Sequence, residues 1–227
     1  MHLYWCISLG LWMTLAELIS AFRVDERDTV EPYQWSRLDL ARWYNEAVEE
    51  AAIRKSLLRE NLEFVLSAGD SEVSLPPRII EVRTARIVEG GATYWLSPSS
   101  RHEQDRLFRN WRDTVERPSA FIHDDISITL NRIVLASSVL KLECCRTPVN
   151  PMEIDEDEPE IAAVHHRYLD GWVRYRAYRV PDADFMDKDR SDRGLADFED
   201  YFGRRSTADH RRDNNADRPH RIKAWWV

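Results

Sequence analysis

Two adjacent histidines, His165 and His166, come nearest to a pattern that could bind a metal ion or move a proton. Neighbouring residues on a helix point about 100° apart, so this pair cannot share one metal ion without other ligands. We therefore expect His165 to be a packed histidine, in the core or at an interface, and His166 to lie on the surface. A metal-dependent hydrolase that uses His165 with acidic partners is an alternative that this spacing does not favour.

Neither the acidic run nor the cysteines form a recognisable catalytic arrangement. Residues 155–158 are all acidic, but no glycine-turned loop or alternating spacing accompanies them, which favours a solvated linker over a cation site. Cys144 and Cys145 end a predicted strand without a base nearby, so we expect packing thiols. No P-loop, dinucleotide fingerprint, nucleophile elbow, HExxH or CxxC motif occurs. The sequence thus predicts a protein that is not an enzyme and uses no metal or cofactor.

The C-terminal end carries the most informative local feature, because the last residues of an otherwise polar tail are apolar. One interpretation is that this end folds back onto its own domain. The other is an anchor that enters a pocket on another subunit, since buried Trp is a typical interface hot spot and an extended tail orders only on docking. We predict the anchor, formed by Ile222, Trp225, Trp226 and Val227.

The composition is that of a globular protein with a highly charged surface. Charged residues make up 32% of the 227 residues, apolar residues 43%, and the net charge is −8. An acidic balance of this size argues against a dedicated, sequence-reading nucleic-acid binder. Only three cysteines occur, two of them adjacent, which indicates a reducing compartment and no disulfide framework.

The chain opens with an uncharged apolar run, residues 1–12. This run lacks a Lys/Arg-rich start and is too short to span a bilayer. Thr14 and Glu17 then form the pattern of a capping box, so the domain is expected to begin at Met13. Residues 1–12 are interpreted as an extension or a start-site artefact. The alternative is a secreted or membrane-tethered binding protein with residues 1–16 as its signal peptide.

Helical patterns dominate both ends of the domain. Residues 35–58 predict one long helix that is N-capped by Ser36 and apolar along one face. Residues 160–180 predict a second helix with an aromatic inner face, and a third ends at Gly203. The residues expected to form the core scaffold of these helices are Trp43, Tyr44, Val48, His165, Tyr168, Leu169 and Trp172.

The intervening segment reads as strands joined by tight turns. Residues 62–66 and 72–75 predict one hairpin, and residues 79–88 and 94–96 a second around Gly90-Gly91. A short helix is expected from Ser99 or Ser100 up to Pro118, followed by strands in residues 120–145. Hairpin connections of this kind predict an antiparallel insert instead of a βαβ sheet.

These patterns combine into an α+β fold that is mainly α. We expect a helical bundle with an inserted antiparallel β-hairpin segment and an extended C-terminal tail. The expected division is an apolar extension at 1–12, a helical core from 13–60 and 159–205, a β-rich insert with a short helix and an acidic linker at 61–158, and a docking tail at 206–227.

Four segments of the chain form a recognisable series: TLAELISAF with Trp35-Ser36 and LARWYNEAVEEAAIR, Leu75-Pro76-Pro77, His165-x-x-Tyr168-Leu169-x-x-Trp172, and Phe198 with Phe202-Gly203. In the order and spacing of these segments the chain resembles the head–tail adaptor, or connector, proteins of tailed bacteriophages over about residues 13–205. Two departures are Val173 after Trp172, where the family pattern has alanine, and residues 1–12, which have no counterpart in the family.

The resemblance implies a structural virion protein at the head–tail junction, made in the bacterial cytoplasm and not associated with a membrane. It implies a ring of about twelve copies closed by heterologous contacts. Such a ring would bind the portal protein above and a tail or nozzle protein below, and would extend the channel through which DNA passes without sequence-specific binding. The C-terminal anchor would then dock on the portal.

Overall fold

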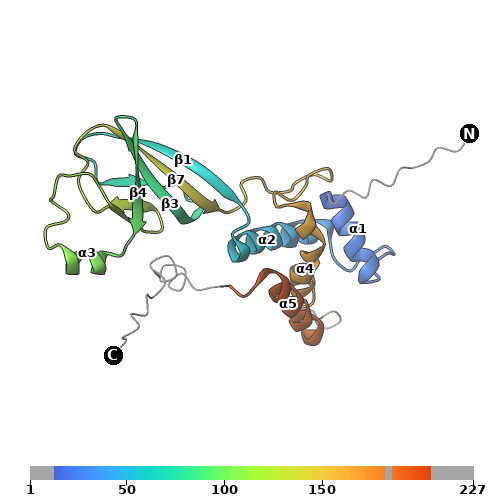
Figure 1. Ribbon diagram of the computed structural model, residues 1–227. Coiled ribbons are helices and arrows are strands. Elements are labelled where there is room, and N and C mark those ends of the chain that lie inside the picture. Colours follow the sequence, from blue (N-terminus) through green and yellow to red (C-terminus); the bar gives the residue numbers. More distant parts are fainter. Residues whose placement is uncertain (1–12, 182–185, 206–227) are drawn as a thin grey trace, which may run out of the picture. The chain divides into compact units, whose positions relative to one another are not determined.

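The computed structural model describes residues 13–181 and 186–205, and these form two compact units (Figure 1). A helical unit combines residues 13–57 with residues 148–204, and a β unit comprises residues 58–147. The chain therefore leaves the helical unit once, builds the β unit, and returns.

The expectation of a mainly helical bundle with a small hairpin insert is wrong. The chain is 35% helical and 25% strand, and its strands form one seven-stranded, nearly closed, barrel-like sheet. The reason is that the strands of the insert pair mostly with distant partners. Seven short strands thus share one core and do not form separate hairpins on a helical scaffold.

Strong N-terminal caps start the long helices of the helical unit. Thr14 and Glu17 form the predicted capping box at α1, the Ser36 side chain accepts from the backbone N–H of Asp39 at α2, and Asp187 caps α5. The helices are α1 (Leu15–Asp25), α2 (Arg37–Lys55), the 3₁₀ turn η1 (Ala163–Tyr168), α4 (Asp170–Ala177) and α5 (Lys188–Phe202).

The single helix expected over residues 160–180 is instead a 3₁₀ turn followed by the short helix α4. In the 3₁₀ turn, the side chain of His166 lies fully inside the unit. Its Nδ1 accepts a hydrogen bond from the backbone N–H of Met13 (3.1 Å), and its Nε2 lies 3.0 Å from the carbonyl oxygen of Ile161. The 3₁₀ turn therefore places the imidazole of His166 within hydrogen-bond distance of two backbone groups, the N–H of Met13 and the carbonyl of Ile161.

The acidic segment after the β unit is fastened to the helical unit at three points. The Asn45 side chain donates to the carbonyl of Met152 (3.0 Å) and accepts from its N–H (2.8 Å). The carbonyls of Asp155 and Asp157 accept from the first N–H groups of α1, at 3.1 and 2.8 Å. Arg37 forms an ion pair with Asp155. The backbone of this segment is therefore held as a loop, while Glu153, Asp155 and Glu156 are exposed, as the prediction of a solvated segment requires.

The β unit arranges its strands in the order β1-β7-β3-β4-β5-β6-β2. Two of its pairings correct the expectation from sequence: β1 and β2 do not pair with each other, and β4 pairs with β5 in parallel across α3. The elements are β1 (Arg59–Leu66), β2 (Glu72–Ser74), β3 (Ile79–Glu89), β4 (Ala92–Pro98), α3 (Arg101–Leu107), β5 (Ala120–His123), β6 (Ser127–Leu130) and β7 (Ser138–Arg146).

The hairpin around Gly90-Gly91 is confirmed, with β3 and β4 antiparallel and both glycines at positive φ. One face of the curved sheet forms a continuous apolar core that includes Leu66, Ile87 and Leu140. Cys144 belongs to the same core, and burial raises the pKa of its thiol to about 12. Both Cys144 and Cys145 are free and buried, as expected for packing thiols.

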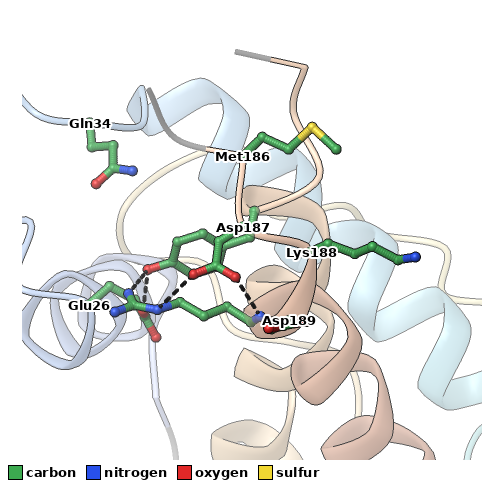
Figure 2. Close-up of a pocket in the computed structure, with 8 residues that line it drawn as sticks. Glu26, Gln34, Met186, Asp187, Lys188 and Asp189 are labelled. Atoms are coloured by element: carbon green, nitrogen blue, oxygen red, sulfur yellow. Dashed lines mark hydrogen bonds and ion pairs between the residues drawn. The ribbon is translucent and has the colours of Figure 1, made fainter. Parts of the chain in front are cut away.

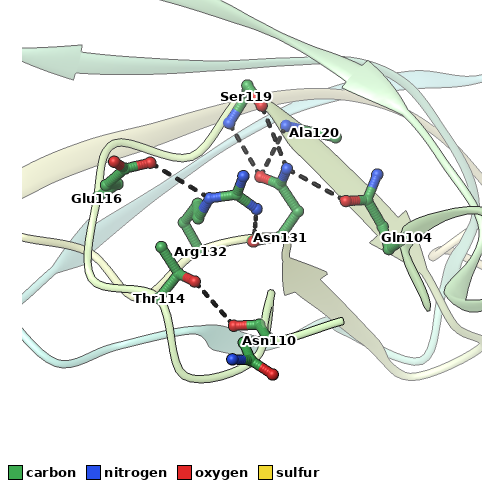
Figure 3. A network of polar contacts seen from close by, with 8 residues as sticks. All are labelled: Gln104, Asn110, Thr114, Glu116, Ser119, Ala120, Asn131 and Arg132. Atoms are coloured by element: carbon green, nitrogen blue, oxygen red, sulfur yellow. Dashed lines mark hydrogen bonds and ion pairs between the residues drawn. The ribbon is translucent and has the colours of Figure 1, made fainter. Parts of the chain in front are cut away.

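A polar network anchors α3 and the loop that follows it to the sheet (Figure 3). The Asn131 side chain is buried and accepts from the backbone N–H groups of Ser119 and Ala120, at 3.0 Å each. Its amide nitrogen lies 3.4 Å from the Oε1 of Gln104 on α3. Arg132 donates to the carbonyl of Asn131 (2.7 Å) and pairs with Glu116 (3.5 Å). One buried asparagine thus joins β6, α3 and the loop after α3.

Candidate functional site

The helical unit contains a buried polar contact at the place where α1, α2 and α4 meet. The hydroxyl of Tyr44, a fully buried residue of α2, lies 2.6 Å from Oδ1 of Asp170 and 2.9 Å from the carbonyl oxygen of Leu18. Asp170 is the first residue of α4, near the positive end of that short helix. A carboxylate thus lies among side chains that the sequence pattern predicts to be apolar.

Burial dominates the protonation equilibria of this contact. It raises the pKa of Asp170 to about 6, although the hydroxyl of Tyr44 and the charge of Arg174 act in the opposite direction. The pKa of Tyr44 is also raised well above its ordinary value, first by burial and then by the neighbouring charge of Asp170. The pair favours its neutral forms more than exposed groups of the same types would.

A pocket of about 410 Å³ adjoins this contact. The rings of Tyr168 and Tyr201 stack along it, with centroids 3.5 Å apart and planes inclined by 8°. The ammonium of Lys55 lies 4.0 Å from the centroid of Tyr201. The lining combines acidic, basic and aromatic side chains: Asp25, Arg167, Tyr168, Asp170, Gly171, Arg174, Asp197, Asp200 and Tyr201.

A second pocket, of about 550 Å³, opens where α1 ends and α5 begins (Figure 2). Glu26 is its central residue and accepts from Arg174 Nε and from the Tyr178 hydroxyl, both at 2.6 Å. The Tyr178 hydroxyl in turn accepts from Arg190 (2.7 Å), whose guanidinium also pairs with Asp187 (3.4 Å). Each of these charged groups has a partner of opposite charge, so the pocket wall is a network that holds α1 to α4 and α5.

The residues predicted as core scaffold divide into two groups. Trp43, Tyr44, Val48 and Leu169 are buried. The other three are half-buried and belong to an aromatic cluster with α5: His165, Tyr168 and Trp172.

The two histidines lie in different environments, and only His166 departs from expectation. His165 contacts Tyr201 through its Nδ1 at 3.0 Å and stays half-buried, and burial lowers its pKa. The surface position expected for His166 is wrong, because that residue is fully buried. The Nε1 of Trp172 is buried and has no hydrogen-bond partner among the described residues. His165 and His166 thus contact different neighbours, Tyr201 in one case and the backbone of Met13 and Ile161 in the other, and both side chains pack against residues of the helical unit.

The predicted docking residues Ile222, Trp225, Trp226 and Val227 lie outside the described residues, and so do residues 1–12. Within residues 13–181 and 186–205, no group of three or more His, Cys, Asp or Glu side chains could hold a metal ion. No helix of the described chain is long and apolar enough to cross a membrane.

Sequence reasoning missed the half-buried carboxylate Asp170 and the network around Glu26. Asp170 left no clear signal, because on a helix it points about 100° away from Leu169 and falls off the predicted apolar stripe, where an acidic residue is expected to be solvated. Glu26 left none, because it lies in a charged connector where a glutamate is expected to be solvated.

Comparison with known proteins gives one family. The family model described as SU10 adaptor protein matches residues 13–223. No curated protein matches the chain significantly. The match begins at Met13, where the capping box predicts the start of the domain, and it spans both the helical unit and the β unit.

Proposed function

This chain belongs to the SU10 adaptor protein family of phage head–tail adaptors, and from that membership we propose how it acts in the virion. As a phage adaptor it is a virion component that associates with other head or tail proteins. We propose that it forms a ring of about twelve copies at the head–tail junction. This ring binds beneath the portal, continues the DNA channel and receives the tail or nozzle protein on its far side.

The observation that carries the proposal is the extent of the family match. Residues 13–223 include the helical unit, the β unit and most of the C-terminal segment, so the likeness involves the whole architecture. A short local motif would be compatible with many functions, whereas a match over nearly the whole chain supports one structural role. In this role the protein supplies surfaces and no reaction.

The charge balance supports a channel that does not retain DNA. The net charge is −8, and DNA carries one phosphate charge per about 1.7 Å of its axis. Non-specific DNA binding depends on releasing counterions from phosphates that Lys and Arg neutralise. An acidic ring offers few such contacts, so DNA can pass through it without stopping.

The proposal assigns portal binding to the end of the chain. Trp225 and Trp226, flanked by Ile222 and Val227, follow a segment rich in Arg and Asp. Two indoles at the end of a polar tail suit an anchor that fills a pocket on the portal, because Trp contributes large buried area per side chain.

Deletion of Lys223–Val227 tests this assignment. We expect the truncated chain to lose at least about tenfold in affinity for the portal protein of the same phage, since an interface hot spot contributes about 2 kcal/mol or more. The thermal transition of the isolated protein is expected to stay nearly unchanged. Co-sedimentation with portal rings and circular dichroism measure the two quantities.

The matched control is Trp95→Ala, which removes an exposed indole from β4 and leaves the tail intact. This control is expected to bind the portal normally. Unchanged portal binding by the truncated chain would remove the anchor. Electron microscopy of portal and adaptor assembled together, if it showed no ring beneath the portal, would overturn the proposed function itself.

A further inference from the structure

The β unit exposes a short basic and apolar segment at the end of α3. Leu107 and Phe108 are 53% and 51% exposed, and Arg106 and Arg109 flank them. Both arginines are exposed, and neither forms an ion pair with a residue that the structure describes. Exposed Phe and Leu between free guanidinium groups are unusual on a surface that faces only water.

This segment is held in a fixed shape. Trp111, two residues after Arg109, is buried, and its indole N–H donates to Asp105 on α3 (2.8 Å). The guanidinium of Arg132 lies 4.8 Å from the centroid of Phe108. The Asn131 network joins Gln104 of the same helix to β6 (Figure 3). A preorganised surface costs little ordering entropy on binding, which favours an interface over a flexible loop.

The chemistry of the segment specifies its partner. Two unpaired guanidinium groups call for carboxylates, with which they form strong and often bidentate hydrogen bonds. The two apolar side chains between them call for an apolar residue at the same place. A partner of matching chemistry therefore presents carboxylates on both sides of an exposed hydrophobic side chain.

The held acidic loop of the helical unit presents that pattern. Ile154 is 58% exposed, and Glu153 and Glu156 on either side of it are exposed and have no ion pair within the described chain. Asp157 fixes the loop, because its carboxylate accepts from the backbone N–H groups of Glu153 (2.7 Å) and Ile154 (2.9 Å). These hydrogen bonds lower the pKa of Asp157 and keep it charged.

We propose that residues 106–109 of one copy dock on residues 153–158 of the next copy. The inference rests on the proposed ring, whose heterologous contacts need two different surfaces on each subunit. Ile154 packs against Leu107 and Phe108, while Arg106 and Arg109 pair with the carboxylates beside it. Every copy offers both surfaces, so the same contact repeats from subunit to subunit.

Charge reversal tests the contact. One variant carries Arg106→Glu and Arg109→Glu, and the other carries Glu153→Lys and Glu156→Lys. Each alone places like charges together, so we expect the concentration for half-assembly to rise by at least about tenfold. Sedimentation velocity and mass photometry measure assembly, alone and with the portal protein. The control Arg27→Glu with Arg193→Glu changes the net charge by as much as the arginine variant does, at two exposed arginines of the helical unit, and should assemble like the wild type.

Mixing the two variants provides the decisive measurement. In an alternating ring, the reversed segment of one variant meets the reversed loop of the other, and the two native surfaces meet each other. A mixture in equal amounts should therefore restore assembly that neither variant shows alone. A contact within one chain would instead be restored only when all four substitutions are in the same molecule.

The outcomes separate this inference from the proposed function. Normal rings from either variant overturn the contact while leaving the adaptor ring in place. Failure of the equimolar mixture to assemble, when each variant is folded by circular dichroism, also overturns it. A wild-type chain that stays monomeric even with the portal protein overturns both the ring and the contact.

Discussion

A single hydroxyl proton determines the behaviour of the contact between Tyr44 and Asp170. The hydroxyl lies within hydrogen-bond distance of two acceptors, the carbonyl of Leu18 and the carboxyl of Asp170, yet it can donate to only one of them. A charged Asp170 can receive this proton, and that hydrogen bond favours the charged carboxylate, but burial acts more strongly in the opposite direction. The net result is a pKa of Asp170 raised to about 6.

Asp170→Asn is expected to remove part of the pH dependence of stability. In the wild type the folded pKa is about 6 and the ordinary value is 3.8. The stabilisation is therefore fully present below about pH 4 and is lost as the pH rises through 6, by up to about 3 kcal/mol. The Asn variant should lack this fall. Urea unfolding followed by helical circular dichroism between pH 4 and 7 measures it.

Tyr44→Phe keeps Asp170 and removes its hydrogen-bond partner, so it checks whether the pH dependence comes from Asp170. It removes a hydrogen bond that lowers the pKa of Asp170, so the fall in stability should move to higher pH. Asp200→Asn, on the exposed side of α5, should leave the profile of the wild type. An unchanged profile in the Asp170→Asn variant would show that Asp170 titrates normally.

The role and burial of a residue could be predicted from the sequence only where a local pattern decides them. The capping residues Thr14, Ser36 and Glu17 could be recognised because their partners lie three residues away. Burial of His166 could not, since its partners are the backbone of Met13, far along the chain, and of Ile161. A side chain whose environment comes from distant segments leaves little trace in its own neighbourhood.

At the scale of the elements, two glycines set how closely α4 and α5 approach. A Cβ added at Gly194 would lie 2.8 Å from the carbonyl oxygen of Gly171 and 2.8 Å from the backbone nitrogen of Tyr175. A Cβ added at Gly171 would lie 3.0 Å from the backbone nitrogen of Phe198. The obstacles are backbone atoms, which cannot rotate away, so these helices can pack at this distance only with glycine.

Gly194→Ala should lower the free energy of unfolding of the helical unit by about 1–3 kcal/mol, as overpacking does in other cores. The better helix propensity of alanine, about 1 kcal/mol, offsets part of a larger clash. Ala196→Leu, on the exposed face of the same helix, adds more volume and should have little effect. Thermal unfolding compares the two, and equal stability of Gly194→Ala and wild type would contradict close packing at this crossing.

Strands could be predicted from sequence more readily than their partners. Alternating apolar residues and the Gly90-Gly91 turn suffice for the β3–β4 hairpin, whose partners are adjacent in the chain. The turn after Leu66 suggested a second hairpin, but β1 pairs with β7 and β2 with β6. The alternation of apolar and polar residues indicates that a strand has one buried face, but it does not indicate which distant strand lies beside it. The barrel-like sheet, and with it the fold class, was therefore missed.

The whole molecule is organised by an insertion whose two ends lie side by side. Arg59 of β1 pairs with Cys145 of β7, and the N–H of Arg146 donates to the carbonyl of Leu58 (3.0 Å). The β unit therefore begins and ends at one place and has its own core. Phage adaptors associate with other head or tail proteins, and a β unit with its own core provides one set of surfaces from within that unit.

The fragment 58–147 is accordingly expected to fold by itself. Its core cluster lies entirely within these residues, and every strand of the sheet pairs inside it. Domains of this size with one continuous core commonly fold alone. Calorimetry should show one cooperative transition for the fragment, at a temperature close to one of the transitions of the full chain. Its amide NMR spectrum should be well dispersed. A fragment that is unfolded while the full chain is folded would show that the β unit depends on the helical unit for its stability, and that the two act as one body in the adaptor.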